Sequence, residues 1–298
     1  MKKVSVIIPT YKNRGGLLKS IDSVLSQDFN GSIEVIVVDD NNPETEDREK
    51  TSALMQIYSN NPKVIYICHD RNKNGAAARN TGIKKSTGDY IALLDDDDFF
   101  LQGKIQKQVS YLNSHPEYSA VYCGAQRGGY PYGTDRSVGD CTKRLLMLQS
   151  CIYTPCQMFK REALLAINGY DETFYRHQDY DLLLRFFHAG FKIGYVPEIL
   201  TEIGTNQGEN ILSGYRLEEM KKSFFEKFMP YIEAINQEDH CFKNRVLSKH
   251  YAGVFLNHIK HRHAGLALRA FVLYFWRSPL TFIAVVTKSV QTHLKKKI

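Results

Sequence analysis

Three short apolar runs, each ended by polar residues, place the strongest constraint on the fold of this 298-residue chain. The runs are Val4–Ile8, Ile33–Val38 and Tyr90–Leu94. Near-continuous apolar strands of this length are typical of parallel sheets that are buried on both faces. Between the first two runs, apolar residues recur at helical spacing from Leu17 to Leu25. We therefore predict an α/β domain built on a mostly parallel sheet flanked by helices.

Polar segments follow the three runs. They are Pro9-Thr10-Tyr11, Asp39-Asp40 and Asp95–Asp98. In an open α/β sheet, ligands bind outside the carboxyl ends of the strands, so we expect these three segments to meet in one crevice.

The run of four aspartates is the strongest indication of a ligand site. Adjacent carboxylates repel one another unless a cation neutralises them, and Mg²⁺ commonly bridges carboxylates to substrate phosphates. The alternative is a solvated acidic turn. For Asp39 and Asp40, a helix cap or an Asx-turn before Pro43 is the alternative to contacts with a base or a ribose.

Two further segments combine small or charged residues. Arg79 lies among the small residues of 72–82 and is suited to contact a phosphate, although a packed helix with a surface arginine is equally consistent with the pattern. Asp179 lies in the first turn of a helical segment, where the helix dipole alone favours a carboxylate. Asp181 and Arg185, four residues apart, predict an exposed ion pair worth roughly a few tenths of a kcal/mol. The Gly- and Tyr-rich segment 124–139 predicts a long loop.

Several well-known motifs are missing from the sequence. It contains no G-x-G-x-x-G after a strand, no phosphate-binding P-loop and no G-x-S-x-G. This argues against a nucleotide-dependent oxidoreductase. The 6 cysteines form no Cys-x-x-Cys pair, and the first apolar run is too short for a signal peptide, so we expect reduced thiols and a cytoplasmic location.

The excess positive charge lies at the C-terminal end. Residues 251–298 hold eight Lys and Arg and no Asp or Glu, which leaves 31 basic and 32 acidic residues in 1–250. This distribution excludes a uniformly basic protein, and we expect no nucleic-acid partner. The uncharged stretches 270–276 and 278–287 are shorter than the ~20 residues of a spanning helix. Basic, aromatic and apolar residues together predict a helical tail that binds an anionic membrane surface. The alternative is a helical bundle that packs on the catalytic domain or forms a homo-oligomer.

Taken in order, seven sequence blocks resemble family-2 inverting glycosyltransferases of the bacterial surface-polysaccharide type. Any one block is weak, and it is their order along residues 1–205 that is specific. The blocks are 4–11 (VSVIIPTY), 20–27 (SIDSVLSQ), 34–41 (EVIVVDDN), 78–83 (ARNTGI), 88–98 (GDYIALLDDDD), 168–172 (NGYDE) and 178–182 (QDYDL).

The resemblance implies a nucleotide-sugar-binding fold of the GT-A type and a role for each matching residue. Pro9, Thr10, Tyr11 and Asp40 correspond to the base pocket, in which Asp40 accepts a hydrogen bond from uracil N3–H. Asp95, Asp96 and Asp97 match the D-x-D motif, with Asp97 as the ligand of Mg²⁺ or Mn²⁺ and Asp95 and Asp96 near the ribose and the donor sugar.

On the same resemblance, Arg79 belongs to the donor side. Asp179 corresponds to the base that deprotonates the acceptor hydroxyl.

The implied reaction is consistent with the residue types. A carboxylate base activates the acceptor, and a divalent cation stabilises the departing diphosphate. A single displacement inverts the anomeric carbon. The expected enzyme is thus a metal-dependent, hexosyltransferase-type enzyme that uses a UDP-sugar and a glycan or lipid-linked acceptor. A catalytically silent nucleotide-sugar-binding or scaffold protein of the same fold is the alternative.

Two positions depart from the family pattern. Asn74 precedes Gly75 where the family usually has Gly two residues after the position of Asn72, and Gln178 replaces the more usual Glu before Asp179. The first changes the residue at a loop position where the family has glycine, and the second removes one acidic group but keeps the proposed base.

The expected organisation has two parts. Residues 1–210 form the catalytic domain, with a nucleotide-binding half (1–110) and an acceptor-side half (111–210). Residues 211–298 form a basic helical region. We expect the protein to be peripheral at the inner face of the plasma membrane.

Overall fold

The structure is a computed structural model of residues 1–298, and it describes all of them except 13–14, 134, 175, 205–211 and 296–298 and the side chains of 292–295. The chain divides into two compact units, which we describe separately. The first comprises Met1–Thr142 and Ser150–Gln207, and the second comprises Lys143–Gln149 and Gly208–Ile298. The second unit thus begins close to the expected boundary at residue 211 and also takes in a short segment from within the expected catalytic domain.

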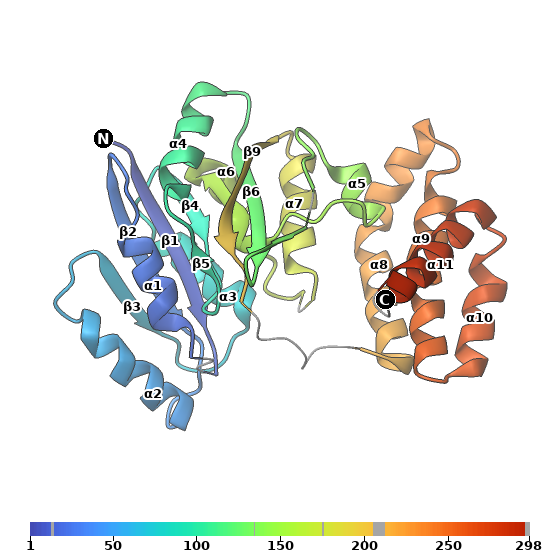
Figure 1. Ribbon diagram of the computed structural model, residues 1–298, viewed down its shortest axis with the longest axis horizontal. Helices are drawn as coiled ribbons and strands as arrows, with labels where there is room; N and C mark the ends of the chain where they lie inside the picture. The colour runs from blue at the N-terminus through green and yellow to red at the C-terminus, as the bar shows by residue number, and fades with distance from the viewer. Residues whose placement is uncertain (13–14, 134, 175, 205–211, 296–298) are drawn as a thin grey trace. The chain divides into compact units, whose positions relative to one another are not determined.

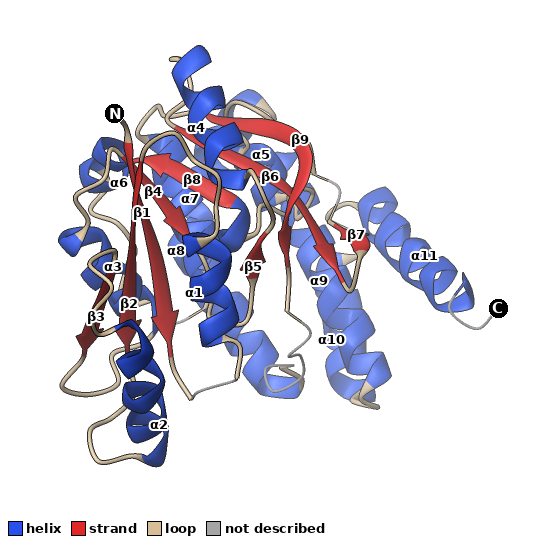
Figure 2. Ribbon diagram, turned by 60° about the vertical axis from the view of Figure 1, so that its left-hand side comes forward, coloured by secondary structure: helices blue, strands red, loops and turns tan. Residues whose placement is uncertain are grey.

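A mixed sheet forms the centre of the first unit (Figure 2). Within the described residues its strand order is β3-β2-β1-β4-β8-β6-β9-β5, with β7 paired to β6. The first four strands are parallel, β8 is antiparallel to both of its neighbours, and β9 is parallel to β6. The strands are β1 (Lys3–Thr10), β2 (Ser32–Asp39), β3 (Val64–Cys68), β4 (Tyr90–Leu93), β5 (Phe99–Phe100), β6 (Ala120–Arg127), β7 (Tyr130–Tyr132), β8 (Gln157–Lys160) and β9 (Ile193–Glu202).

Helices follow or separate these strands. They are α1 (Leu17–Leu25), α2 (Glu46–Met55), α3 (Gly75–Lys85), α4 (Lys104–Ser114), α5 (Thr142–Leu146), α6 (Arg161–Ala166) and α7 (Gln178–His188), with short 3₁₀ turns at Gln56–Tyr58 and Thr154–Cys156. The apolar runs of the sequence become β1, β2 and β4, whose central side chains are fully buried. The predicted α/β fold on a mostly parallel sheet is confirmed for the part of the chain that contains β1 to β4.

The acceptor-side half differs from the sequence-based expectation. The segment 124–139 is not one long loop, because β6 continues to Arg127 and turns into β7 at Gly128 and Gly129. Both glycines have positive φ angles (57° and 80°), which two-residue hairpin turns require. Strands β8 and β9 were not predicted.

Four helices make up most of the second unit (Figure 1). They are α8 (Gly214–Glu238), α9 (Phe242–Lys260), α10 (Ala264–Tyr274) and α11 (Pro279–Lys295). α9 contacts each of the other three. The described part of 211–298 is therefore helical, as predicted, and α11 begins at Pro279, a residue that is favoured in the first turn of a helix. No helix in the described residues is long and apolar enough to cross a membrane.

The segment Lys143–Gln149 is held on these helices by a buried histidine. His250 Nε2 donates to the carbonyl oxygen of Leu146 (2.8 Å), so Nδ1 is left to accept from Lys221 Nζ (3.2 Å). Burial lowers the pKa of Lys221 to about 8. This contact explains why a short piece of the expected catalytic domain belongs to the helical unit.

Candidate functional site

The carboxyl ends of β1, β2 and β4 lie side by side, as expected for a parallel sheet. The backbone N–H of Asp40 donates to the carbonyl oxygen of Thr10 (2.9 Å), and that of Leu94 donates to the carbonyl oxygen of Ile7 (3.1 Å). Thr10 Oγ1 donates to Asp96 Oδ2 (2.6 Å), which connects the end of β1 to the aspartate run. The three polar segments therefore meet at one edge of the sheet.

The four aspartates form a packed turn and not a solvated one. Asp95 accepts from Arg79 Nη2 (2.6 Å), and Asp98 is buried and accepts from the backbone N–H of Gly204 (2.7 Å). Burial, followed by the charges of Asp95 and Asp97, raises the pKa of Asp98 to about 8. Asp98 is therefore mostly protonated at neutral pH, and the charge of Asp95 is paired with Arg79, so the turn does not carry four unpaired negative charges.

Two glycines allow the backbone to pack closely against this turn. A Cβ atom at Gly16 would lie 2.8 Å from Asp97 Cα, and one at Gly204 would lie 2.3 Å from the Asp97 carbonyl oxygen. Asp97 also lines a cavity of about 830 Å³ that opens between α1, β5 and the end of β9. That cavity is not lined by Asp40, Arg79 or Asp179, so it adjoins the predicted nucleotide site without containing it.

The Asp40 carboxylate is buried and accepts from four donors within the protein. Oδ1 is 2.7 Å from His69 Nδ1 and 2.8 Å from the backbone N of Lys73, and Oδ2 is 2.9 Å from both Asn72 Nδ2 and the backbone N of Asn74. A carboxylate has about four acceptor positions, so a uracil N3–H would have to displace one of these donors. Asp40 fixes the shape of the 72–74 loop.

The departure from the family pattern at Asn74 has a structural explanation. Asn74 has φ 91° and ψ 166°, a backbone conformation that is normally restricted to glycine. Its side chain caps α3 by accepting from the backbone N–H groups of Ala76 (2.9 Å) and Ala77 (3.2 Å). The capping bonds offset the conformational strain, so asparagine is tolerated where the family has glycine.

We expect Asn74→Ala to destabilise the protein by about 1–2 kcal/mol, because it removes the helix cap and keeps the strained backbone. Asn74→Gly should lie within about 0.5 kcal/mol of the wild type, because relief of strain replaces the cap. Urea denaturation of both variants would measure this difference. If both variants lose the same free energy of unfolding, the strained backbone is not the reason why Asn74→Ala is destabilising.

Arg79 links the aspartate run to the start of α7. Besides its ion pair with Asp95, its guanidinium lies over the ring of Tyr170 (5.5 Å), and its charge acts on Asp179. Burial raises the pKa of Asp179, and the positive charge of Arg79 partly opposes this shift. Asp179 is thus a partly buried carboxylate at the N-terminus of α7, in the same polar cluster as Asp95. The alternative for this segment is half right, because the alanines of α3 are packed but Arg79 is largely buried and not a surface residue.

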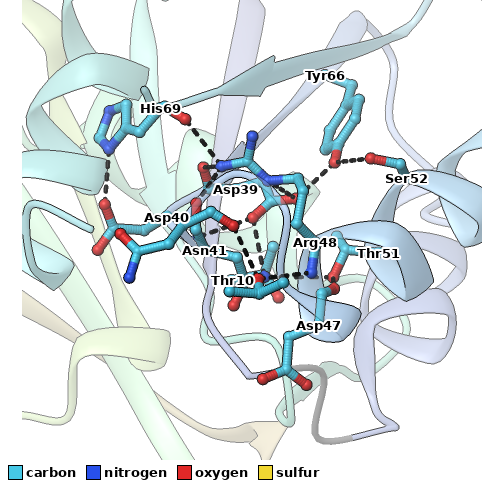
Figure 3. Close-up of polar contacts among 12 residues, drawn as sticks. Thr10, Asp39, Asp40, Asn41, Asp47, Arg48, Thr51, Ser52, Tyr66 and His69 are labelled. Carbon is cyan, nitrogen blue, oxygen red and sulfur yellow. Dashed lines mark hydrogen bonds and ion pairs between the residues drawn. The ribbon is translucent and has the colours of Figure 1, made fainter. Parts of the chain in front are cut away.

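Asp39, the last residue of β2, and Arg48 on α2 form a buried ion pair next to Asp40 (Figure 3). Asp39 Oδ2 lies 3.1 Å from Arg48 Nε and accepts from the Tyr66 hydroxyl (2.6 Å). Arg48 also donates to the carbonyl oxygen of His69 (2.8 Å), so it joins the ends of β2 and β3. Asn41 closes an Asx-type turn onto Asp39 Oδ1 (2.9 Å). Asp39 therefore forms the Asx-turn that was the alternative to contacts with a base or a ribose. The sequence did not predict the part that Arg48 plays.

Pro9 and Tyr11 complete the predicted base pocket. Pro9 is partly buried at the end of β1, and Tyr11 is exposed, with Lys12 Nζ 5.4 Å from the centre of its ring. The backbone N–H of Lys12 donates to Asn41 Oδ1 (2.8 Å), which ties the end of β1 to the turn after β2. An exposed aromatic ring beside the sheet edge suits stacking on a planar base.

The ion pair between Asp181 and Arg185 on α7 is more buried than predicted. Asp181 is almost fully buried, and Arg185 bonds to it (2.9 Å) and to the carbonyl oxygens of Ile167 and Gly169 (both 2.6 Å). The prediction of a weak exposed pair was wrong. Asn80 Oδ1 accepts from the backbone N–H of Tyr170 (2.8 Å) and thereby holds the 167–170 loop against α3.

A model of the family "Glycosyl transferase family 2" matches residues 5–177, which is more than half of the chain. The chain belongs to glycosyltransferase family 2. The predicted family and GT-A fold are thus confirmed.

Relatives of this family-2 glycosyltransferase differ in how much of their length they share with it. The amylovoran biosynthesis glycosyltransferase AmsB of Erwinia amylovora is 30% identical over 231 residues, which cover 70% of this chain and 73% of AmsB. An uncharacterised glycosyltransferase of Rickettsia bellii is 40% identical over 125 residues, covering 40% of this chain but only 17% of that protein. The S. aureus TarS structure in complex with UDP-GlcNAc has a similar fold, with a TM-score of 0.68 at 16% identity, covering 95% of this chain and 83% of that chain.

The glycosyltransferase site contains residues that the sequence did not reveal. Arg48, His69 and Tyr170 all contact predicted site residues or their neighbours. His69 follows β3 directly and Asp40 follows the neighbouring strand β2, whose last residue pairs with Cys68, so the pairing of these two strands was the available signal. Arg48 lies on a polar helix whose sequence gives no sign of a buried partner.

Proposed function

We propose that this glycosyltransferase moves a sugar from a UDP-sugar to a hydroxyl group of a glycan or lipid-linked acceptor, by a metal-assisted displacement that inverts the anomeric carbon. The observation that carries the proposal is the cluster in which Arg79 bonds Asp95 and acts on Asp179. This cluster brings the end of the donor-binding strand β4 and the first turn of α7 to one place. A donor and an acceptor could therefore meet there.

Asp179 is the proposed general base. Its oxygen would take the proton from the acceptor hydroxyl as that oxygen attacks the anomeric carbon, and the bond from this carbon to the diphosphate oxygen would break. The backbone N–H groups of Tyr180 and Asp179 and the charge of Arg79 oppose the rise that burial causes in the Asp179 pKa. The raised pKa makes it a stronger base than an exposed aspartate.

Asp97 would hold the divalent cation. The turn offers only oxygen ligands, which suit Mg²⁺ or Mn²⁺, and Asp95 and Asp96 already bond to Arg79 and Thr10. Mg²⁺ is commonly held by one or two carboxylates together with substrate phosphates, so Asp97 would share the cation with the donor diphosphate. When bound, the cation would stabilise the charge on the departing diphosphate.

The proposed donor is UDP-linked because the TarS structure of the same fold was obtained with UDP-GlcNAc. In this chain, Pro9, Thr10, Tyr11 and Asp40 would form the base pocket. Tyr11 is exposed and would stack on the base, and Asp40 shapes the 72–74 loop. Arg79, Asp95 and Asp96 would face the ribose and the sugar.

The proposed acceptor is a glycan or a lipid-linked sugar of surface-polysaccharide biosynthesis. The name of AmsB supports a polysaccharide pathway. A lipid-linked acceptor would bring the enzyme to the inner face of the plasma membrane as a peripheral protein. The basic C-terminal end agrees with this location, although Lys296 and Lys297 lie outside the described residues and nothing is described of the side chain of Lys295.

A thermal-shift panel tests the proposed donor. UDP-Glc, UDP-Gal, UDP-GlcNAc and UDP-GalNAc would each be tested with and without Mn²⁺. A ligand present at 100 times its Kd stabilises a protein by about 2.7 kcal/mol, which raises Tm by roughly 5–10 °C for a domain of this size. We expect at least one donor to give such a shift, larger with Mn²⁺. The absence of any shift would refute the UDP-sugar proposal.

The pH dependence of donor hydrolysis tests the link between Arg79 and Asp179. A base must be ionised, so kcat/KM should fall as the pH drops through the Asp179 pKa, which burial raises above the ordinary value of about 3.9. Arg79→Gln removes a charge that lowers this pKa and should move the acid limb to higher pH, whereas Arg79→Lys should move it less. An acid limb at the same pH in all three proteins would show that Arg79 does not act on the base.

A further inference from the structure

One side of α10 is apolar and uncovered in the described structure. The side chains of Leu268 (64%), Val272 (56%), Leu273 (50%) and Trp276 (74%) are exposed, and Leu280 (85%) continues the surface at the start of α11. We call these five residues the α10 face. The opposite side of the helix packs inward through Ala267 and Ala270, which are almost fully buried.

The spacing shows that this exposure is a continuous stripe. Leu268, Val272 and Trp276 follow one another at four-residue intervals, so they lie along one side of the helix and its C-terminal turn. A helix that is apolar on all sides is normally buried, and large exposed apolar patches mark interaction sites. The α10 face is therefore expected to have a partner.

The charges around the α10 face indicate the chemistry of that partner. Residues 251–298 hold eight Lys and Arg and no Asp or Glu. Arg277 and Lys288 are exposed on the turn and on α11. Arg269 is exposed on α10 itself, within 3.7 Å of Glu218 on α8. Glu218 and Glu219 of α8 lie on the Leu273 side of the face, whereas Arg277 and Lys288 are on the side of Trp276 and Leu280. Apolar side chains flanked by basic residues at this end match the interface of an anionic lipid bilayer, where tryptophan is also favoured.

The length of α10 limits how it can meet a bilayer. Eleven residues extend over about 16 Å, roughly half of the ~30 Å hydrocarbon thickness. The helix can therefore lie in the interface with its apolar side inward, but it cannot span the bilayer.

We propose that the α10 face is the membrane-docking surface of this protein, with Trp276 and Leu280 inserted at the boundary between headgroups and acyl chains of an anionic bilayer. This inference rests on the peripheral location in the proposed function and deepens it. It assigns the binding to α10 and the start of α11 and not to the lysine cluster 295–297. The basic residues attract anionic lipid, and the apolar side chains supply the insertion.

The protein carries its own reporter for this surface. Trp276 is the only tryptophan among the 298 residues, so tryptophan fluorescence reports on the α10 face alone. On titration with vesicles of phosphatidylcholine and phosphatidylglycerol, we expect a blue shift of the emission. Brominated acyl chains in the same vesicles should quench it. Vesicles of phosphatidylcholine alone should give a much weaker response.

Three variants separate the α10 face from other surfaces. Val272→Asp keeps Trp276 and places a carboxylate in the stripe, so partitioning should weaken by about tenfold or more. Ile57→Asp is the matched control, because Ile57 is similarly exposed (67%) but lies in the first unit. Changing Lys295, Lys296 and Lys297 to Gln tests the terminal cluster and should leave the blue shift and the quenching in place.

Three results would overturn the proposal. One is vesicle binding that is lost in the terminal-lysine variant but kept in Val272→Asp. Another is a blue shift that grows with protein concentration without vesicles, which would assign the α10 face to a second copy of the chain. The third is the absence of any response to anionic vesicles. The UDP-sugar thermal shift of each variant is measured in parallel, so a failed donor proposal cannot be confused with a failed docking surface.

Discussion

Replacing Asp179 by Asn is expected to lower donor turnover by about 10²–10⁴-fold, the usual contribution of a positioned general base. The amide keeps the size of the side chain but cannot take a proton from the acceptor. Because Asp179 lies at the start of α7 and not in the proposed base pocket, binding of the UDP-sugar should persist. We would measure release of UDP under saturating donor together with the thermal shift caused by the same donor.

Glu46→Gln is a suitable control for this experiment. It makes the same carboxylate-to-amide change at an exposed position on α2 and should leave turnover unchanged. Equal turnover by Asp179→Asn and the wild type would remove Asp179 from the role of base. A loss of donor binding in Asp179→Asn would mean that the residue acts on the donor.

Replacing Arg48 by Met should destabilise the catalytic unit by about 3–5 kcal/mol, because it leaves the buried Asp39 carboxylate without its cationic partner. Tyr66 and Asn41 still donate to Asp39, so the lower end of this range is expected. The double variant Arg48→Met/Asp39→Asn should recover part of the loss, since it removes the unpaired charge. Urea denaturation of the three proteins provides the comparison.

Lys50→Met serves as the matched control on the same helix. Lys50 pairs with Glu46 on an exposed surface, where an ion pair contributes about 0–1 kcal/mol. If Lys50→Met and Arg48→Met cost the same, the Asp39–Arg48 pair would not be the anchor that joins β2 to β3.

The sequence predicted the parts of the fold that local patterns control. β1, β2 and β4 are buried on both faces, so their apolar runs are visible in the sequence, and their polar ends meet because parallel strands end at one edge. β9 was missed because its sequence contains a proline and several exposed residues and its pairing with β6 is irregular. Its position depends on contacts with strands far away in the chain.

The site was predictable to a similar degree. Asp40 and Asp95 stand out at strand ends, whereas the roles of Arg79 and Asp179 came from the family resemblance. The partners of all four were not identified, because each partner comes from another element. The strained backbone of Asn74 shows the limit most clearly. A family comparison marks this residue as a departure, and only the backbone angles and the capping bonds explain why it is acceptable.

Direct displacement at the anomeric carbon, with Asp179 as the base, fixes which anomer of the sugar is released. Proton NMR can follow hydrolysis of the α-linked UDP-sugar that stabilises the protein most, with Mn²⁺ replaced by Mg²⁺ to avoid line broadening. We expect the β-anomer of the free sugar to appear first and Asp179→Asn not to form it at a comparable rate. Initial formation of the α-anomer would contradict a single displacement.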